Sequence, residues 1–336
     1  MNENNVKKVL IIKLCCLGDV IQVTPALKNL KNSGCEIHYL CAGFVKPLLE
    51  LVPFIDKIFT INFKNVFDVF KTLSALNREN YDLVINFHRD LKSFIFAFFV
   101  RSKTKAGFEW GKSRFFLSKS FKFDPKIHES ERYLSVIRGL GFDVTDKFTH
   151  INVPDKPKER IEITGEKKAG IFPGGGENPG TVMYTKRWPI ENFVELSVML
   201  IKDGFTVYAF GGAMDKPLID KLREKVPEIR NAVTAGIQDF VYYVSKMDVF
   251  VAPDTGPLHI AAATGIKTIG LFGPSSPELV APSNGNSVYI KGECNCSPCY
   301  VPETVHKKEF LKCRDNVCMK TIKPEMVYKI IKEGEK

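Results

Sequence analysis

Residues that could take part in catalysis follow short apolar runs, at the points where a strand would give way to a helix. In the first half of the chain, Gly18 and Asp19 come after the apolar segment Val6–Leu14. A glycine at such a turn lets a ligand or another backbone approach closely. The local sequence leaves two interpretations of Asp19 open: its carboxylate could cap the following helix, or it could face a ligand site as a general base.

The second half of the chain repeats this arrangement in four glycine-containing turns. They lie at Pro173–Gly176, Phe210–Gly212, Pro253–His259 and Phe272–Pro277, and Asp215 follows the second of them. Helix N-termini offer free N–H groups and the positive end of the helix dipole, which suit phosphate. None of the turns matches the dinucleotide fingerprint or the P-loop. Several of them at strand ends nevertheless favour a nucleotide site over simple structural turns.

Two neighbouring cations, Lys186 and Arg187, stand just ahead of a predicted helix start at Trp188 and Pro189. Positive charges there oppose the helix dipole, so their position calls for an explanation. One interpretation is a solvated surface pair. The other is a clamp on a diphosphate, in which the lysine acts as a point charge and the arginine as a fork.

Five cysteines cluster near the C-terminus with the spacing C-x-C-x₂-C-x₁₃-C-x₄-C, and His306 lies in the longest gap. Two pairs of cysteines suit a tetrahedral metal site, although this spacing is not that of a standard zinc finger. We expect either loop thiols or disulfides, or a structural zinc or iron ion held by Cys296, Cys299, Cys313 and Cys318, with Cys294 beside them. The remaining cysteines are predicted to be buried apolar fillers: Cys15, Cys16, Cys35 and Cys41.

Alternating strands and helices must position these residues, in the pattern of parallel sheets with crossover helices. In the first half, the predicted strands are Val6–Leu14, Glu36–Ala42, Ile58–Ile61 and Leu83–Phe87, and the predicted helices are Val20–Lys31, Val66–Asn77 and Leu91–Val100. In the second half, the predicted strands are Ala169–Gly174, Phe205–Gly212, Asp248–Gly256 and Lys267–Pro274, and the predicted helices are Pro189–Lys202, Leu258–Thr264 and Lys323–Lys332.

The segment Val153–Lys168 interrupts the alternation, with two prolines and nine charged residues among few apolar ones. It is typical of an interdomain linker, and the alternative is a long loop inside one domain. A chain of 336 residues is long enough for two domains. We therefore predict an N-terminal domain over 1–155, a C-terminal domain over 168–322 and a terminal helix over 323–336.

Composition excludes several classes of protein. With 44% hydrophobic and 26% charged residues, the chain is neither disordered, collagen-like nor a small disulfide-stapled domain. Lys13 interrupts the first apolar stretch, so no signal-peptide core is predicted. The longest apolar run elsewhere, Phe94–Val100, is far shorter than the roughly 20 residues of a spanning helix. Nine cysteines without a secretion signal indicate a reducing cytoplasm.

The net charge of +10 is distributed unevenly. Residues 1–160 hold 26 basic and 17 acidic side chains, or +9, whereas residues 161–336 hold 22 and 21, or +1. Such asymmetry suggests an anionic partner for the first half alone: nucleic acid, a membrane surface or an acidic substrate.

Four motifs together resemble glycosyltransferase family 9, the heptosyltransferase-like enzymes of lipopolysaccharide assembly. They are LGDVIQVTPAL at Leu17–Leu27, KRWP at Lys186–Pro189, PDTGPLHIAAATG at Pro253–Gly265 and LFGPSSP at Leu271–Pro277. Their order is that of the family, and they span most of the chain. The resemblance implies an α/β fold of two Rossmann-like domains of the GT-B type, facing a central cleft.

The resemblance also implies roles for individual residues. Asp19 matches the catalytic carboxylate, which would take the proton from the acceptor hydroxyl, and Lys186 matches a lysine that contacts the donor phosphates. Asp215 stands where some members carry a glutamate for the ribose hydroxyls, and it is one methylene shorter. Pro257 departs from the leucine of some members and supplies no N–H. The donor-binding set is then Gly18, Lys186, Arg187, Asp215, Asp254, Thr255, Gly256, Pro257, Leu258 and His259.

The resemblance implies inverting transfer without a catalytic cofactor, with heptose from ADP-heptose as the sugar and a lipopolysaccharide core precursor as the acceptor. The basic first domain would hold this anionic, lipid-linked acceptor at the cytoplasmic face of the inner membrane. The segment Leu91–Gly111 is the predicted acceptor region, with Arg89 and Lys92 as contacts. Two alternatives stay open: a nucleotide-sugar epimerase of similar fold, and a nucleic-acid-binding protein, although no recognisable nucleic-acid-binding motif is present.

Overall fold

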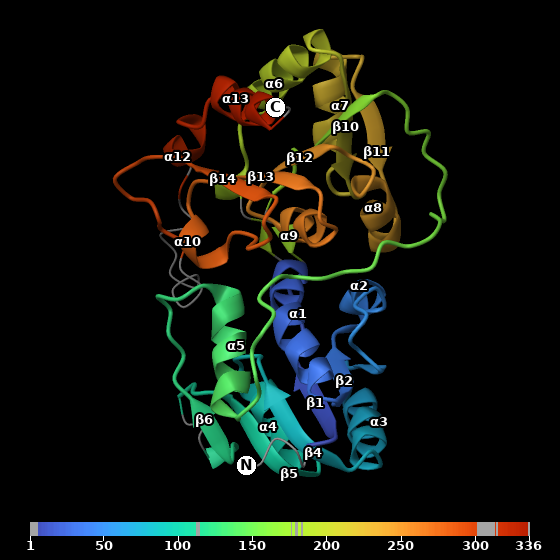
Figure 1. Ribbon diagram of the computed structural model, residues 1–336, viewed down its shortest axis with the longest axis vertical. Helices are drawn as coiled ribbons and strands as arrows, with labels where there is room; N and C mark the ends of the chain where they lie inside the picture. Colours follow the sequence, from blue (N-terminus) through green and yellow to red (C-terminus); the bar gives the residue numbers. More distant parts are fainter. Residues whose placement is uncertain are drawn as a thin grey trace. The chain divides into compact units, whose positions relative to one another are not determined.

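The protein is described by a computed structural model, which covers residues 6–111, 115–175, 177–178, 181–182, 184–300, 313 and 315–334. Its contacts divide the chain into two compact units, Met1–Asn152 and Val153–Lys336. The dividing point is the start of the charged segment Val153–Lys168 (Figure 1). Part of that segment is held by unit 2, because the Lys158 amide donates to Asp239 at 2.7 Å.

Unit 1 is built on a six-stranded sheet in the order β3-β2-β1-β4-β5-β6, with every pair parallel. This order, which steps outward on both sides of β1, is that of a doubly wound Rossmann-like domain. The strands are β1 (Lys8–Ile12), β2 (Glu36–Cys41), β3 (Lys57–Thr60), β4 (Tyr81–Asn86), β5 (Ser102–Phe108) and β6 (Lys119–Phe121).

The helices of unit 1 follow their strands and bury apolar faces against the sheet. Three of them have side-chain caps: Asn65 accepts from the Asp68 amide at 3.2 Å, Asp90 from the Ser93 amide at 2.6 Å, and His128 from the Ser130 amide at 3.3 Å. The longest helix, α1, packs against α5. The helices are α1 (Leu17–Asn32), η2 (Gly43–Val45), α2 (Lys46–Leu49), α3 (Val66–Asn77), α4 (Leu91–Phe99) and α5 (Glu129–Gly139).

Unit 2 repeats the same topology, with a parallel sheet in the order β11-β10-β7-β12-β13-β14. Its strands are β7 (Lys167–Ile171), β10 (Phe205–Gly211), β11 (Arg230–Val233), β12 (Val249–Pro253), β13 (Lys267–Phe272) and β14 (Ser287–Lys291), and a small antiparallel pair is formed by β8 (Glu177–Asn178) and β9 (Thr181–Val182). Its helices are η4 (Tyr184–Lys186), α6 (Ile190–Lys202), α7 (Lys216–Lys225), α8 (Ile237–Val244), α9 (Gly256–Ala263), α10 (Pro277–Val280), α12 (Val317–Lys320) and α13 (Pro324–Glu333). The last of these packs against α6 and completes the core of unit 2.

The predicted α/β class and the two Rossmann-like domains are therefore confirmed. Every predicted strand and helix is present, and the bounds of α3 are those predicted. The elements that sequence reasoning missed include α5, which carries part of the candidate site. The missed strands are β5, β6, β8, β9, β11 and β14, and the missed longer helices are α5, α7 and α8.

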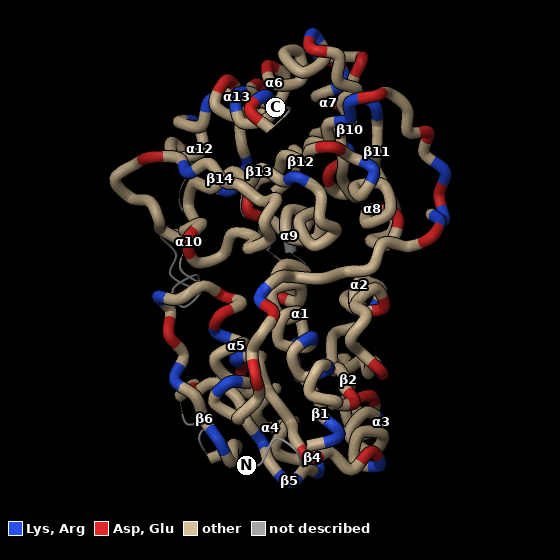
Figure 2. Tube along the Cα trace, viewed as in Figure 1, with Lys and Arg blue, Asp and Glu red and all other residues tan. Residues whose placement is uncertain are grey.

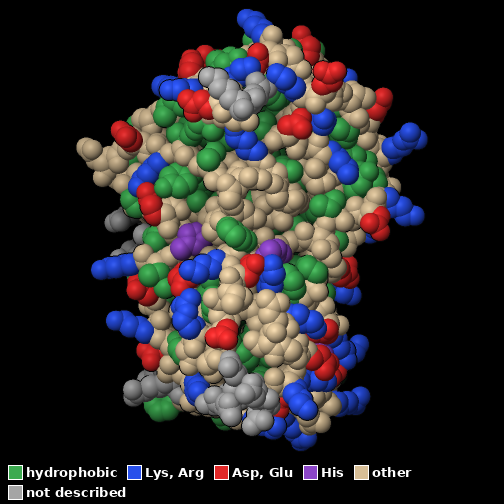
Figure 3. Space-filling view, viewed as in Figure 1, with side chains coloured by type: hydrophobic (Ala, Val, Ile, Leu, Met, Phe, Trp, Pro, Cys, Tyr) green, Lys and Arg blue, Asp and Glu red, His purple; other side chains and the backbone are tan. Residues whose placement is uncertain are grey.

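The surface of unit 1 carries both charge and exposed apolar side chains. Lysines and arginines recur along β5, β6 and α5 (Figure 2), and on the face shown in Figure 3 they project from much of the margin of this unit. Phe67 and Phe70 on α3 and Phe98 and Phe99 on α4 are exposed. Among the described residues, no helix is both long and apolar enough to cross a membrane.

Candidate functional site

Asp19 lies just beyond the carboxyl end of β1, in the first turn of α1. The helix begins at Leu17, so Cys16 occupies the cap position and Asp19 is the third helical residue. The interpretation of Asp19 as the cap is therefore wrong. Its carboxylate instead accepts a hydrogen bond from Lys13 Nζ at 2.8 Å, and about a third of the Asp19 side chain (35%) remains exposed. An oriented and partly exposed carboxylate at this edge is what a general base requires.

Lys13 is buried, and residues of α5 complete its surroundings. Its Nζ lies 5.6 Å from the centre of the Tyr133 ring, and the Tyr133 hydroxyl donates to Glu129 at 2.7 Å. Burial works to lower the pKa of Lys13, but the electrostatic interaction with Asp19, followed by those with Tyr133 and Glu129, holds that pKa well above its usual value. Lys13 is thus a fixed cation beside Asp19.

Glu129 is the second carboxyl group of this cluster, and sequence reasoning missed it. Burial, followed by repulsion from Asp19, raises the pKa of Glu129 above its usual value. Glu129 and Tyr133 are separated from Asp19 by more than a hundred residues. The only local signal is their i, i+4 spacing, which places both side chains on one helix face.

In unit 2, Lys186 is held in a buried network instead of standing free on the surface. Its Nζ donates to Asp254 Oδ2 at 2.6 Å and lies 4.1 Å from the centre of the Tyr300 ring. The same Asp254 oxygen accepts from the Ser275 hydroxyl at 2.6 Å, and His259 Nε2 lies 3.6 Å from Oδ1. The interpretation of Lys186 as a solvated surface cation is therefore wrong.

This network keeps Asp254 ionised. Burial works to raise the pKa of Asp254, but the charge of Lys186 and the hydrogen bond from His259 outweigh it and hold that pKa well below its usual range. A buried ion pair of this kind fixes both side chains in place. Asp254 is thereby the anchor for Lys186, at the carboxyl end of β12.

At the start of α9, fewer backbone amides are available to a phosphate than the predicted donor-binding turn, Asp254–His259, would offer. Thr255 is the N-cap residue, and its carbonyl already accepts from the Leu258 and His259 amides at 3.1 and 3.4 Å. Pro257 has no N–H, and the Leu258 side chain is fully buried. The groups suited to a phosphate are therefore the amides of Thr255 and Gly256, which an α-helix leaves without an internal partner.

Asp215 lies between the turns after β7 and β10. Its Oδ2 accepts from the Gly212 amide at 3.0 Å, and a Cβ added at Gly174 would meet Asp215 Oδ1 at 2.1 Å. Only a glycine lets the first turn approach the carboxylate so closely. Beside it, a Cβ at Gly175 would meet Arg187 Cγ at 3.0 Å. The predicted donor residues of unit 2 thus gather at the carboxyl ends of β7, β10 and β12, where ligands of open α/β sheets bind.

The two predicted acceptor residues, Arg89 and Lys92, follow the carboxyl end of β4. The Arg89 guanidinium lies 3.5 Å from the centre of the Phe123 ring, and Lys92 is exposed on α4. Strand β4 is the neighbour of β1 in the sheet, so Arg89 and Asp19 follow adjacent strand ends of unit 1.

The five C-terminal cysteines line one cavity of about 260 Å³. All nine cysteines of the chain are free thiols, and the sulfurs of Cys294 and Cys296 are 3.3 Å apart. Within the described part of the chain, however, no three thiols lie mutually within 4.8 Å. The four predicted metal ligands thus line one cavity, together with Cys294. His306 lies outside the described residues.

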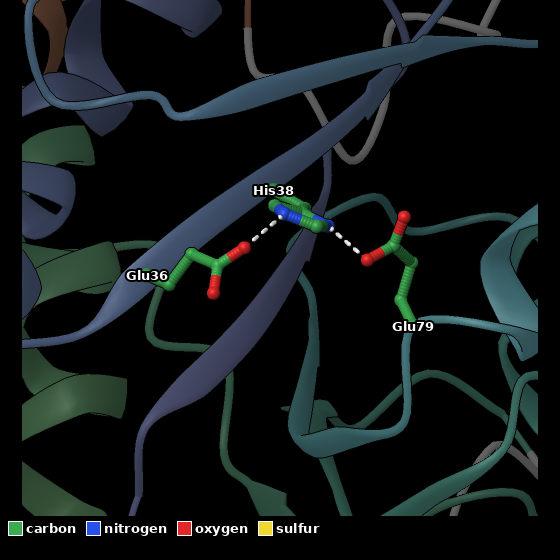
Figure 4. A group of neighbouring side chains, drawn as sticks. All are labelled: Glu36, His38 and Glu79. Atoms are coloured by element: carbon green, nitrogen blue, oxygen red, sulfur yellow. Dashed lines mark hydrogen bonds and ion pairs between the residues drawn. The ribbon is translucent and has the colours of Figure 1, made fainter.

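Another group of possible metal ligands consists of Glu36 and His38 on β2 and Glu79 just before β4 (Figure 4). His38 Nε2 is 2.8 Å from Glu36 Oε1, and Lys8 Nζ lies 3.2 Å from Glu36 and 3.1 Å from Glu79. Lys57 also pairs with Glu79, so two lysines neutralise the two carboxylates, and this group is a structural charge network near the amino ends of the strands.

Comparison with known proteins agrees with this geometry. A model of glycosyltransferase family 9 (heptosyltransferase) matches residues 69–309. The lipooligosaccharide heptosyltransferase 2 of Haemophilus influenzae is 27% identical over 312 residues, covering 84% of this chain and 88% of its own.

Solved structures share the fold over nearly the whole chain. A family 9 glycosyl transferase from Veillonella parvula has a TM-score of 0.75 at 22% identity and covers 97% of this chain and 96% of its own. The Escherichia coli heptosyltransferase WaaC with ADP also has a TM-score of 0.75, at 18% identity, and covers 97% and 99%. The iron-containing dodecameric glycosyltransferase TibC of Escherichia coli has a TM-score of 0.60 at 13% identity and covers 98% and 76%. The family match extends over more than half of the sequence, and the chain therefore belongs to glycosyltransferase family 9, with two Rossmann-like domains of the GT-B type.

Proposed function

We propose that this protein is an inverting heptosyltransferase, which moves heptose from ADP-heptose to an anionic lipopolysaccharide core acceptor. The observation that carries the proposal is the orientation of Asp19 by the buried Lys13, at the edge of the unit 1 sheet. The names of the relatives support the sugar and the acceptor, because the Haemophilus protein is a lipooligosaccharide heptosyltransferase. The ADP in the WaaC structure supports the nucleotide.

In the proposed reaction, Asp19 removes the proton from the acceptor hydroxyl as its oxygen attacks C1 of the donor sugar. The bond from C1 to the diphosphate oxygen breaks on the opposite face, so the configuration at C1 inverts. ADP leaves with the bonding electron pair. No metal takes part in this step, and general base catalysis typically contributes about 10²–10⁴-fold to such a rate.

The leaving diphosphate develops negative charge, which unit 2 is suited to stabilise. The Thr255 and Gly256 amides stand at the N-terminus of α9, where the helix dipole favours an anion. Lys186 supplies a cation that Asp254 and the Tyr300 ring hold in place before any ligand arrives. Such preorganised groups stabilise developing charge without having to rearrange. Asp215, between two turns, is our proposed contact for the ribose hydroxyls.

We assign the acceptor to unit 1, because this part of the chain carries most of the net positive charge. Arg89 and Lys92 are the proposed contacts for acceptor phosphates or acidic sugars. The exposed Phe67 and Phe70, together with lysines nearby, would place this unit against the anionic cytoplasmic face of the inner membrane. The function proposed here leaves no role for nucleic acid.

We also propose that the C-terminal cysteines hold a structural zinc or iron ion. Thiolates are the ligands that both metals accept, and one cavity collects Cys294, Cys296, Cys299, Cys313 and Cys318. The protein purified without added metal should contain about one bound ion by elemental analysis. Cys299→Ser should lose it and Cys35→Ser, in unit 1, should keep it; an ion-free wild-type protein would end this proposal.

The function itself is tested by ligand screening followed by a transfer assay. ADP and ADP-heptose should raise the melting temperature more than UDP, GDP or their sugars, because a ligand that binds only the native state stabilises it. Heptose should then move to an acceptor that lacks it, with inversion detected by NMR. Conversion of the donor to an isomer without acceptor would favour the epimerase instead.

A further inference from the structure

We propose that Cys15 and Cys16 form a peroxide-sensitive dithiol at the start of α1, and that its oxidation to a vicinal disulfide arrests sugar transfer. The consequence for transfer rests on the proposed function. The formation of the disulfide depends only on the thiols and their surroundings.

The two thiols are already in contact and open to solvent. Their sulfurs lie 3.5 Å apart, and both residues are partly exposed. The prediction that they are buried fillers is therefore wrong, whereas Cys35 and Cys41 are buried as predicted. A small oxidant can reach Cys15 and Cys16, while the two buried cysteines of the same unit are protected.

The charges around Cys15 favour its thiolate. A hydrogen bond from Cys16 lowers the pKa of Cys15, and electrostatic interactions with His88 and Lys13 act in the same direction, against burial and Asp19. The same contact raises the pKa of Cys16. Reactive cysteines are those with thiolate character and access to solvent. Cys15 is thus the residue that reacts first, and Cys16 is the resolving thiol.

The backbone links this pair to the proposed base. Cys16 is the N-cap residue of α1, with φ of +70°, a conformation that a residue other than glycine rarely adopts. Its carbonyl accepts from the Val20 amide at 3.0 Å and so closes the turn that contains Asp19. Any change in the backbone at Cys15 and Cys16 is therefore transmitted to Asp19 and its bond with Lys13.

A disulfide between neighbouring residues forces such a change. Adjacent Cα atoms are about 3.8 Å apart, which is shorter than the roughly 4.4–6.8 Å between cysteines of ordinary disulfides. Closing this small ring must distort the start of the helix. Strained disulfides are also easily reduced, and for this reason they serve in regulation more often than in stabilising a fold. The arrest should therefore be reversible by thiols.

The chemistry is a two-electron oxidation by hydrogen peroxide. The Cys15 thiolate attacks one peroxide oxygen, the O–O bond breaks, and the departing hydroxide takes up a proton to become water. The Cys15 sulfenic acid that results is then attacked by the Cys16 sulfur, which loses its proton as the sulfenic hydroxyl leaves as a second water. Two thiols are oxidised to one disulfide, and the peroxide is reduced to water.

The test treats the full-length protein with hydrogen peroxide and follows both the thiols and the activity. The tryptic peptide of residues 14–28 contains both cysteines. We expect this peptide to lose two hydrogens and to escape alkylation, and the transfer rate to fall at least about tenfold and to return with dithiothreitol. ADP affinity should not change, because the nucleotide site lies in unit 2.

Variants identify which thiols are responsible. Relative to its own untreated rate, Cys15→Ser should resist peroxide, and Cys16→Ser should form a sulfenic acid that a dimedone probe labels. The matched control Cys35→Ser should behave like the wild-type protein.

Two results would overturn the proposal: a 14–28 peptide that keeps both thiols while activity is lost, or a disulfide that leaves transfer unchanged. A protein that transfers no sugar before oxidation would instead refute the proposed function, and the peptide would still show whether the dithiol closes.

Discussion

Lys13 Nζ donates a 2.8 Å hydrogen bond to Asp19 Oδ2, and the lysine side chain is 9% exposed whereas that of the aspartate is 35% exposed. The pair therefore has a buried cationic end and an anionic end that reaches solvent. Because Lys13 is buried and donates this hydrogen bond, it orients the Asp19 carboxylate. This relationship makes Lys13 a positioning residue for the proposed base.

Replacing Lys13 should impair transfer without affecting the nucleotide. In Lys13→Met, the carboxylate loses the hydrogen bond from Lys13 Nζ and becomes free to rotate. We therefore expect kcat to fall about 10–100-fold, which is less than the roughly 10²–10⁴-fold that a general base itself contributes. ADP affinity, measured by calorimetry, should stay within twofold of wild type. Lys13→Arg, which keeps a cation, is the matched control and should retain more activity than Lys13→Met; equal losses would show that the charge is not what matters.

The ion pair between Lys186 and Asp254 should be a stability element as well as a donor site. Asp254→Asn leaves a buried ammonium without its counter-charge, which typically costs about 3–5 kcal/mol. Denaturant unfolding should show this loss, and the double variant Lys186→Met with Asp254→Asn should recover part of it. A single variant Asp254→Asn as stable as wild type would mean that the pair is open to water.

Two glycines near Asp215 offer a matched comparison of its role. In Gly174→Ala, the added Cβ would lie 2.1 Å from Asp215 Oδ1, whereas in Gly212→Ala the nearest side-chain atom, Asp215 Oδ2, would be 4.0 Å away. We expect the first substitution to displace the carboxylate and weaken ADP binding at least fivefold, and the second to have little effect. Equal affinities in titration calorimetry would remove Asp215 from the donor site.

Stability should fall in mildly acidic solution because of His38. Burial lowers the pKa of His38 below its usual value of 6.5, so the unfolded chain takes up a proton more readily than the native protein. The native state is therefore favoured above pH 6.5, and this contribution is lost as the pH falls below that value. His38→Gln should flatten the pH dependence of the unfolding free energy between about pH 5 and 7, and an unchanged slope would assign that dependence to other groups.

Local patterns in the sequence were sufficient to predict the alternating α/β class of both halves, whereas the GT-B type was implied by the resemblance to family 9. Apolar runs identified β1, β2, β4, β10, β12 and β13, and α3 was predicted with its bounds. In the structure, the side chain of Asn65 caps this helix. Helix α5 was missed because its segment carries four charged residues among few apolar ones. Its contribution to the candidate site is evident only from the structure, which places Glu129 and Tyr133 beside Lys13.

The candidate site was predictable to the extent that its residues lie in turns after strands. What the sequence does not contain is the pairing of distant residues. Lys186 seemed misplaced ahead of a helix because its partner, Asp254, is 68 positions further along the chain. In the same way, nothing in the local sequence indicates that position 174 must be glycine to make room for Asp215. Gly174 lies in the turn after β7, whereas Asp215 follows β10.

The proposal that Asp19 is the catalytic base is tested most directly by Asp19→Asn, a substitution of nearly the same shape without the charge. Single-turnover transfer from ADP-heptose to an acceptor should be measured beside ADP affinity for both proteins. We predict that transfer slows at least a hundredfold while ADP affinity remains within twofold of wild type. Transfer at a rate close to that of the wild-type protein would contradict the role of Asp19 and the mechanism built on it.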